Sequence, residues 1–445
     1  MSKETSDERL RQTRRSALGG LLGTALEYFD FTMYGIVAAV VFGKVFFPAQ
    51  DSGMAEIGAM ASFGVAYIAR PIGALVLGHL GDRVGRQKML LFTIVLMGSA
   101  TFLIGCLPSY QTIGVFAPAA LVILRLAQGF SAAGEQAGSS ALTMEHAPVR
   151  RRSFYTSWTN TGTMLGMVLG QIAFVPVLAL REQDLLAWGW RLPFLLSAVG
   201  MVVVIFIRKG LHDADVFVAA RREERRPPMP LRELFRSNWK NLIRVVLCCL
   251  MAAPASIASV FGLSYATRVV GINPSILVLS GVLGTAIGMV TIPFWAMLSD
   301  RIGRRPVFIG GVLIAGVMIF PVLHFTSTGN VLLIVVFHYL FTIFLMAGQA
   351  LQLTIYTEMF ETKVRFSGVA VGTQFGYLLA GFAPTISYLI LQPGPNGWMP
   401  VAVFGALCCV VAAAAAFSAR ETRGVSLERL DGALPAPQSV PERLT

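Results

Sequence analysis

The sequence is poor in charged residues. Only 13% of its 445 residues are Asp, Glu, Lys or Arg, whereas soluble proteins average about 25%. Hydrophobic residues make up 55% of the chain, and apolar runs of about 18 or more residues recur from end to end, each long enough to cross a bilayer as a helix. A membrane β-barrel has alternating segments of about ten residues instead. The composition therefore predicts an all-α integral membrane protein.

Patterns for nucleotide, metal and nucleophilic chemistry are missing as well. No Gly-x-x-x-x-Gly-Lys-Ser/Thr run for binding phosphates occurs, the five histidines are dispersed, and no Ser/His/Asp set stands out. The cysteines have neither metal nor redox spacing and lie in or beside apolar segments, where we expect them to pack as small hydrophobic side chains: Cys106, Cys248, Cys249, Cys408 and Cys409. We therefore expect no enzyme activity, no cofactor, no metal site and no ATP-driven pumping.

Twelve apolar segments are long enough to be membrane-spanning helices. They lie at residues 17–43, 55–80, 89–107, 117–144, 153–180, 191–208, 242–269, 275–298, 307–325, 331–357, 366–392 and 398–418. A polar stretch between the sixth and the seventh contains "RREERRPPMP" and is typical of a solvated linker. The predicted organisation is a segment 1–16, a six-helix half 17–208, a linker 209–241, a second half 242–418 and a tail 419–445.

Basic residues indicate the orientation. With the N-terminus in the cytosol, about 30 of the 36 Lys and Arg residues fall in cytosolic segments and about four in outer loops. This asymmetry predicts that both termini are cytoplasmic. The first 16 residues are polar and the apolar run after them is too long for a signal peptide, so we expect the N-terminus to be retained. The protein is then a multi-pass protein of the plasma (inner) membrane, and its net charge of +12 reflects these loops rather than binding of nucleic acid.

The two halves repeat each other. "GHLGDRVGRQKM" at 78–89 follows the second span, and "AMLSDRIGRRPV" at 296–307 follows the second span of the other half. After the fourth span of each half, a Glu precedes an Arg by seven residues, at Glu145 and Arg152 and at Glu358 and Arg365. Two six-helix halves with matching loops are typical of a transporter built from parallel repeats.

These loops resemble the signature of the major facilitator superfamily. Within it the chain resembles the metabolite:proton symporters, the branch that holds shikimate, 2-oxoglutarate, citrate and proline/betaine permeases. The similarity covers nearly the whole chain and includes "EYFDF" at 27–31, "RLAQGFSAAGE" at 125–135 and "WGWRLPFLLS" at 188–197. Two departures are "SAAGE", where many members carry a further Gly, and a Pro-rich tail without the coiled coil of osmosensing members.

The repeated loops are candidates for a conformational latch. Glycines in them permit tight turns, and an Asp at a helix end suits the positive end of a neighbouring helix dipole. The resemblance implies that Asp82 holds the two halves closed on the cytosolic side; the alternative is that these charges only fix topology. The candidate latch residues are Gly78, Asp82, Arg83, Gly85, Arg86, Glu145, Arg152, Asp300, Arg301, Gly303, Arg304, Glu358 and Arg365.

Five ionisable residues fall inside the expected spans, where each costs about 2.5–3.5 kcal/mol near the bilayer centre. They are Glu27, Asp30, Arg70, Arg125 and Glu135. Helical rise places Glu27, Arg70 and Glu135 at one depth, with Asp30 and Arg125 further out. We expect either a structural pair between Arg70 and Glu135 or groups that face a cavity.

Polar stripes at helical spacing predict a shared aqueous path. The resemblance implies that helices 1, 4, 7 and 10 surround it, and the stripe on helix 7 is the thinnest. The predicted substrate contacts are Arg125, Tyr34, Gln128, Gln349, Gln352 and Tyr356. Arg125 is the predicted anchor for a carboxylate, because Arg pairs with carboxylates through two hydrogen bonds. Gln128 and Gln136 could instead hold helices together.

The leading hypothesis is proton-coupled symport of a small organic acid, either shikimate-like or a mono- or dicarboxylate. A carboxylate in a low-dielectric cavity holds a proton more readily, so Asp30, Glu27 or Glu135 is the predicted proton carrier. A zwitterion carrier for proline or betaine and a non-transporting membrane sensor remain alternatives. The expected partners are the carboxylate substrate, the proton and the lipid bilayer, with the protein as a monomer.

Overall fold

The computed structural model describes residues 3–47, 52–209 and 230–431. These residues form helices and connecting turns, and no strand occurs among them. Eleven helices are long and apolar enough to cross a membrane, and a bent pair, Leu10–Val37 with Val40–Phe46, makes up to twelve. The prediction of an all-α protein with twelve spans is therefore confirmed.

The first half has six long helices. They are α1 (Lys3–Val37), which continues through a π-helical turn (Ala38–Phe42) into α2 (Gly43–Phe46), α3 (Ser52–Val84), α4 (Arg86–Cys106), α6 (Phe116–His146), α7 (Arg152–Leu178) and α9 (Arg191–Lys209). Two short helices, α5 (Tyr110–Ile113) and α8 (Glu182–Asp184), lie in its connections. The boundary expected at residue 16 is not a helix end, because α1 is already helical from Lys3.

The second half repeats this arrangement. Its first span is α12 (Trp239–Cys248), α13 (Ala252–Ser256) and α14 (Gly262–Tyr265), joined by 3-10 and π-helical turns; the others are α15 (Pro274–Ile302), α16 (Arg304–Thr328), α17 (Val331–Glu358), α18 (Arg365–Gly381) with α19 (Ala383–Ile390), and α20 (Met399–Ser418). A short helix, α21 (Leu427–Leu430), follows. The expected linker is partly helical, because α11 (Pro230–Ser237) lies within it and α12 begins at Trp239 rather than 242; residues 210–229 lie outside the described residues.

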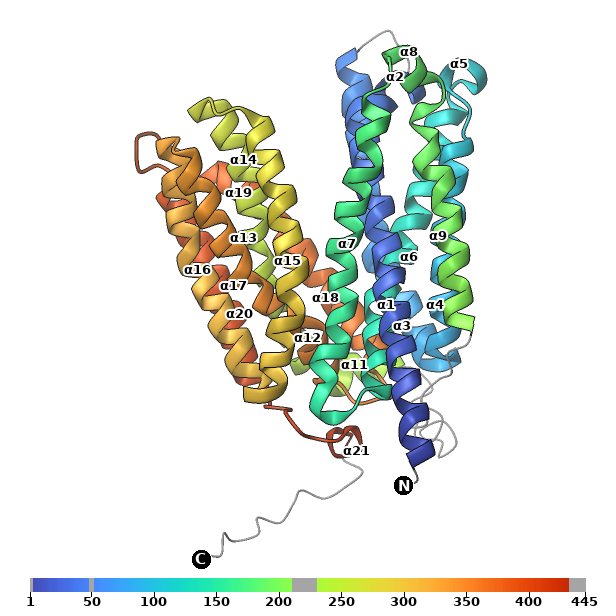
Figure 1. The fold of residues 1–445 in the computed structure, drawn as a ribbon, viewed down its shortest axis with the longest axis vertical. Coiled ribbons are helices and arrows are strands. Elements are labelled where there is room, and N and C mark those ends of the chain that lie inside the picture. Colours follow the sequence, from blue (N-terminus) through green and yellow to red (C-terminus); the bar gives the residue numbers. More distant parts are fainter. Residues whose placement is uncertain (1–2, 48–51, 210–229, 432–445) are drawn as a thin grey trace, which may run out of the picture.

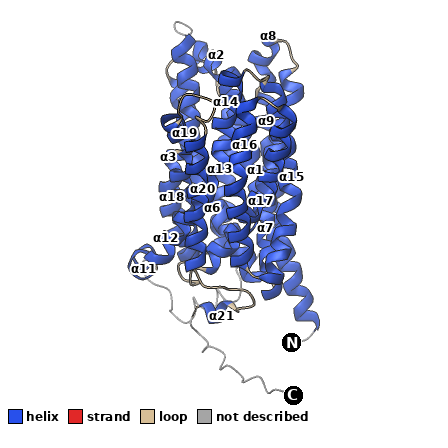
Figure 2. Ribbon diagram, turned by 90° about the vertical axis from the view of Figure 1, so that its left-hand side faces the viewer, coloured by secondary structure: helices blue, strands red, loops and turns tan. Residues whose placement is uncertain are grey.

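The two halves form two bundles that lie side by side (Figure 1). Their ribbons come together at one end of the molecule and diverge toward the other, and the helices run along the long axis in both views (Figures 1 and 2). We call the end that carries the loops at 78–89 and 296–307 the latch end. The start of α1 and the short helix α21 are also found there.

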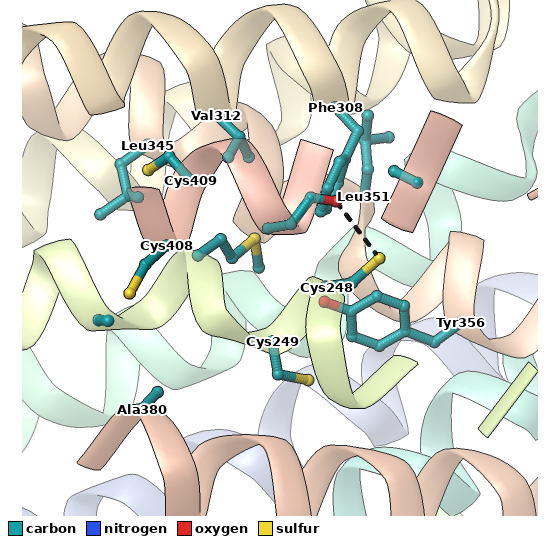
Figure 3. Close-up of a cluster of buried hydrophobic side chains, with 14 of the residues drawn as sticks. Cys248, Cys249, Phe308, Val312, Leu345, Leu351, Tyr356, Ala380, Cys408 and Cys409 are labelled. Atoms are coloured by element: carbon teal, nitrogen blue, oxygen red, sulfur yellow. Dashed lines mark hydrogen bonds between the residues drawn. The ribbon is translucent and has the colours of Figure 1, made fainter. Parts of the chain in front are cut away.

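Apolar packing holds each bundle together. In the first half, Phe42, Phe46, Trp190 and Phe194 make edge-to-face ring contacts, a preferred geometry for aromatic pairs. In the second half, a mostly apolar core surrounds four buried cysteines (Figure 3). Those four pack as small hydrophobic side chains, as the sequence predicts, whereas Cys106 is exposed.

Candidate functional site

At the latch end, Asp82 of α3 caps the first turn of α18 in the other half. Its carboxylate accepts hydrogen bonds from the backbone N–H of Phe366 (3.2 Å) and of Ser367 (2.8 Å), and from the Ser367 hydroxyl (2.7 Å). The first N–H groups of a helix have no partner within it, and the helix dipole favours an anion at this position. Asp82 therefore holds two halves of the chain together.

The glycines of this loop let the two helices approach closely. A Cβ atom added at Gly78 would lie 2.9 Å from Cα of Ser367, and one added at Gly81 would lie 2.0 Å from the ring of Phe366. Gly85 has φ +127°, a conformation that other residues rarely adopt. The contact between α3 and α18 thus depends on these positions having no side chain.

The second copy of the loop makes the equivalent contact in the opposite direction, from the second half to the first. Asp300 of α15 accepts from the backbone N–H groups of Ser153 (3.1 Å) and Phe154 (3.0 Å) in the first turn of α7. Gly303 has φ +120°, like Gly85 in the first copy. Each half therefore caps a helix of the other half with an Asp from its repeated loop.

Buried ion pairs connect the two caps. Glu145 pairs with Arg86 of its own half and with Arg365 of the other, the latter at 2.9 Å. Glu358 pairs with Arg304 (3.4 Å) and with Arg152 across the interface (3.6 Å). Arg83 and Arg301, also predicted for the latch, lie exposed on the surface and are absent from these pairs.

The segment after α20 also contacts the latch, which the sequence did not indicate. Glu421 accepts from the backbone N–H groups of Arg304 and Arg305, both at 3.0 Å. Arg152 of the first half donates to the carbonyl of Val425 (2.6 Å). Asp431, at the end of the described chain, accepts from the N–H (2.8 Å) and the hydroxyl (2.5 Å) of Thr362.

Deeper in the first half, Asp30 lies in a fully buried polar network. Its carboxylate accepts from Thr101 of α4 (2.6 Å) and Ser197 of α9 (2.7 Å). Gln128 donates to the same Thr101 hydroxyl (2.7 Å) and accepts from Arg125 (3.0 Å). The predicted proximity of Asp30 and Arg125 is thus realised through two intervening side chains.

Arg125 lies inside the first bundle rather than at its surface. It is 0% exposed, and its guanidinium lies 4.5 Å from the ring centroid of Phe31 and 3.9 Å from that of Tyr34. The Tyr34 hydroxyl donates to Ser62 (2.8 Å). In this conformation, a buried layer inside the first bundle is therefore formed by Arg125, Gln128 and Tyr34.

The structural pair expected between Arg70 and Glu135 does not form. Glu135 pairs instead with Arg208 at the end of α9, through both carboxylate oxygens. Arg208 also donates to the carbonyls of Gly19 and Leu90. Arg208 is the last residue of its apolar segment, a position typical of a basic residue at a cytosolic helix end, but its side chain folds back into the bundle and pairs with Glu135 in place of Arg70.

Arg70 is paired with Glu27 instead. The distance from Nη2 to Oε1 is 3.7 Å, which is long for a charge-assisted hydrogen bond. The guanidinium lies over the rings of Phe31 (4.4 Å) and Tyr67 (4.9 Å). Among the described residues, neither Nε of Arg70 nor Oε2 of Glu27 has a hydrogen-bond partner.

A third cluster of polar side chains connects the two halves about midway along the helices. Tyr377 of α18 donates to Gln352 (2.8 Å), and Gln352 donates to Asn160 of α7 (3.1 Å). Asn160 donates in turn to the carbonyl of Gln349 (2.5 Å). Gln349 and Gln352, both predicted for the site, therefore lie at the interface between the halves.

Tyr356, the last residue of the stripe on α17, lies elsewhere. Its ring is fully buried in the core of the second half beside Cys248 and Cys249 (Figure 3). The stripe crosses from the interface into the core because helical spacing does not determine which neighbour covers each turn. Tyr356 is consequently not in position to touch a substrate in this conformation.

A cavity of about 400 Å3 lies between α7 and the second half. Its wall is mostly apolar, with Met164, Met167 and Met346 among the lining residues, as in many small-molecule sites. The polar lining residues are Gln171, Ser259, Ser280, Thr285, His338 and Thr342. Its lining includes residues near the starts of α15 and α17, which lie away from the latch end, so the cavity is on the side where the bundles diverge.

Comparison with known proteins decides the family. The sequence profile of the Major Facilitator Superfamily matches residues 20–384. The chain belongs to this superfamily. Its relatives include the shikimate transporter of Escherichia coli (strain K12), 34% identical over 428 residues that cover 93% of this chain and 96% of the relative. The proline/betaine transporter of the same strain is 32% identical over 443 residues, covering 96% of this chain and 87% of the relative.

The fold agrees with that of solved members. The structure of the proton:xylose symporter XylE bound to 6-bromo-6-deoxy-D-glucose superposes with a TM-score of 0.75 at 16% identity, covering 96% of this chain and 99% of that chain. The chain is thus a multi-pass membrane transporter with two six-helix halves, as predicted from its repeated loops.

Several residues of this transporter's polar network escaped the sequence analysis. Thr101 and Ser197, which hold Asp30, are hydroxyl residues within apolar helices. A signal was available on α4, where Thr93 and Thr101 lie eight residues apart and so share one helix face; Thr93 contacts Glu135 (3.3 Å). Asn160 and Tyr377 offered no comparable pattern, because their roles depend on contacts between the halves.

Proposed function

We propose that this transporter is a proton-coupled symporter of a small organic acid that works by alternating access. The observation that carries the proposal is the buried network in which Asp30 is linked through Thr101 and Gln128 to Arg125. A carboxylate held by neutral hydroxyls in a desolvated site changes between charged and neutral forms at moderate cost. The similarity to the shikimate transporter supports an organic acid as the substrate.

In this proposal Asp30 carries the proton. When ionised, it is stabilised by the two hydroxyl donors and by the nearby charge of Arg125. When it takes up a proton, that stabilisation is lost, and the Gln128 and Thr101 side chains must rearrange. Protonation of Asp30 therefore changes the packing of α1 against α4, α6 and α9. A change in this packing can favour one conformation of the whole first bundle over another.

We further propose that the latch end faces the cytoplasm, with both termini there, in the plasma (inner) membrane. The excess of basic residues in the loops of this end supports this orientation. The described conformation is then closed toward the cytoplasm, and the cavity next to α7 is open toward the outside. The proposed functional unit is the monomer, because both caps of the latch lie within one chain.

The test is transport by the purified protein in proteoliposomes. Labelled shikimate, 2-oxoglutarate, proline and glycine betaine are offered with and without an inward proton gradient. We expect the gradient to drive accumulation of an organic acid and a protonophore to abolish it. Accumulation that is indifferent to the gradient would refute proton coupling, and transport of none of the four would refute the proposed substrate class.

Symport of proline or betaine is the second candidate. It is supported by the relatives named as proline/betaine transporters, which cover 96% of this chain. The same panel of substrates separates the two candidates, because glycine betaine and proline carry no net charge at neutral pH whereas shikimate is an anion.

A further inference from the structure

We infer that Arg70, and not the predicted Arg125, binds the carboxylate of the transported molecule, which is an organic anion without a quaternary ammonium group. The inference rests on the proposed function and names its anchoring residue and substrate class. It follows from a comparison of the three buried arginines of the first half that lie outside the latch, namely Arg70, Arg125 and Arg208.

Two of the three arginines are committed to their own bundle. Arg125 is 0% exposed, donates to Gln128 and lies between two aromatic rings. Arg208 is 1% exposed and donates to Glu135, to Ser139 and to two backbone carbonyls. A substrate carboxylate reaching either of them must first break these buried contacts, which is costly in a low-dielectric interior.

Arg70 is different in both its partner and its exposure. It is 9% exposed, and among the described residues its ion pair is the long 3.7 Å contact with Glu27, whereas Arg125 and Arg208 each donate a 3.0 Å hydrogen bond to a side chain of their own bundle. All three arginines have an Nε without a hydrogen-bond partner among the described residues, so what sets Arg70 apart is the long ion pair of its terminal nitrogens, because buried charged groups normally make short hydrogen bonds. Arg70 therefore has donor capacity left for a ligand.

The location of Arg70 is that of a substrate site. Its neighbour Tyr28 is also a side-chain hydrogen-bond partner of Arg70, and the Tyr28 hydroxyl accepts from Gln136 of α6 (3.3 Å). Gln136 also donates to Thr163 of α7 (3.3 Å), which lies one helical turn from Asn160, the residue that accepts from Gln352 of the other half. A molecule bound at Arg70 would therefore meet both bundles at the mid-height interface, as alternating access requires.

The rings around Arg70 favour an anion. Recognition of a quaternary ammonium group requires free aromatic faces. The faces of Phe31 and Tyr67 already receive the Arg70 guanidinium, and Tyr34 receives that of Arg125. Stacking leaves the N–H edge of a guanidinium available for a carboxylate. The aromatic rings of α1 and α3 thus present a cation to the substrate.

Glu27 is the resident competitor of the substrate. Its carboxylate occupies the neighbourhood of the guanidinium when no substrate is bound. Protonation of Glu27 removes this competition, so anion binding at Arg70 strengthens as the pH falls. The variant Glu27→Gln leaves the site permanently without the competing charge.

The test measures binding of shikimate and of its uncharged methyl ester to the purified transporter by isothermal titration. We expect the wild type to prefer the acid. Arg70→Gln should weaken binding of the acid about tenfold or more and bring the acid-to-ester ratio close to one, because a hydrogen-bonded charge pair is lost. Glu27→Gln should bind the acid more tightly than the wild type near neutral pH and depend less on pH, with the remaining dependence due to Asp30, which stays titratable.

Arg191→Gln is the matched control, because Arg191 is a partly buried arginine of the same half that donates to backbone carbonyls far from the site. Its acid-to-ester ratio should equal that of the wild type. Arg70→Lys provides a second variant if the glutamine form does not fold, and should keep part of the preference for the acid.

An unchanged ratio in both Arg70 variants would overturn the inference, as would a ratio that collapses only in Arg125→Gln. A wild type that binds glycine betaine more tightly than shikimate would overturn the assignment of an anion. These outcomes leave proton-coupled uptake intact. If the wild type shows no uptake driven by a proton gradient, the proposed function itself fails.

Discussion

Asp30 and Glu135 are both buried carboxylates of the first half, but their surroundings differ. Asp30 accepts hydrogen bonds from the hydroxyls of Thr101 and Ser197 and has no ion pair among the described residues. Glu135 is held by both terminal nitrogens of Arg208. Neutralising Glu135 would leave a buried arginine uncompensated, which is costly. Of the predicted proton carriers, Asp30 and Glu27 therefore remain suited to the role, and Glu135 is suited to a structural one.

The change Asp30→Asn should separate accumulation from exchange. Asparagine resembles the protonated acid, so the loaded carrier still reorients and counterflow exchange should survive with a flattened pH dependence. Accumulation driven by an inward proton gradient should be lost, because no proton is carried. Both are measured in the same vesicles. Accumulation by Asp30→Asn at the wild-type level would exclude Asp30 as the sole carrier.

The change Glu135→Gln should act mainly on stability. It leaves the Arg208 guanidinium buried without its counter-charge, and breaking a buried pair in this way costs about 3–5 kcal/mol. Thermal unfolding in detergent should therefore occur at a clearly lower temperature than for the wild type. Asp30→Asn is the matched comparison, since asparagine still accepts from Thr101, and its unfolding temperature should change less. Equal effects of the two changes would contradict the structural role of Glu135.

At the scale of the helices, the repeated loops are where sequence and structure agree most closely. Both copies of Asp-Arg-x-Gly-Arg were recognisable because each turn needs a glycine in a conformation that other residues avoid, at Gly85 and Gly303. The partners of the Asp residues were not recognisable. Asp82 contacts Ser367, 285 residues away, and a single sequence contains no signal for a contact between two halves.

The same limit applies inside the bundles. Periodicity assigned polar residues to a face of each helix, which was enough to bring Asp30, Gln128 and Arg125 into one network. It could not decide whether that face meets the interface or a neighbouring helix of the same half. Tyr356 and Arg125 are both predicted substrate contacts lining an aqueous path, and both lie in the interior of a bundle in this conformation.

The cap of α18 by Asp82 should control how often the latch end opens. In Asp82→Asn, an amide N–H replaces one of the two oxygens that face backbone N–H donors, so the cap is weakened. A cysteine in place of Ser153, placed in a Cys106→Ser background, should react faster with a membrane-impermeant thiol reagent from the latch side. Lys88→Gln, an exposed change in the same loop, is the control. Unchanged labelling and turnover in Asp82→Asn would contradict the latch.

At the scale of the whole molecule, the segment of residues 419–431, which follows α20, lies outside the two bundles and contacts residues of the latch. It contacts the first half through Arg152 and Val425, and the second half through Glu421 with the start of α16 and Asp431 with Thr362. Thr422 additionally donates to Glu358 of the latch. Of these contacts, the hydrogen bond from Arg152 to Val425 crosses between the halves, so it favours the closed state. The contacts of Glu421, Thr422 and Asp431 hold the segment where that bond can form.

Glu421 makes this contribution dependent on pH. Partial burial raises the pKa of its carboxyl, but hydrogen bonds from the backbone N–H groups of Arg304, Arg305, Arg423 and Thr422 outweigh this and lower the pKa below its usual value of 4.5. A carboxylate whose pKa is lowered in the folded state stabilises that state fully above its ordinary pKa. The stabilisation is lost as the pH falls through the lowered pKa.

Removing the Glu421 charge should therefore loosen the latch at neutral pH but make little difference in acid. In Glu421→Gln, one oxygen remains to accept from the first turn of α16, but the favourable interaction with the helix dipole is lost. Labelling of the cysteine at position 153 is compared between the variant and the wild type from about pH 7 to about pH 3, with a reagent whose reactivity is calibrated at each pH on a free thiol. The variant should label faster near neutral pH, and the two rates should converge in acid because the wild-type carboxyl is then protonated.

Arg420→Gln, at the exposed neighbouring position, should follow the wild type throughout. A difference between Glu421→Gln and the wild type that persists unchanged in acid would show that the carboxylate charge is not what holds the segment in place.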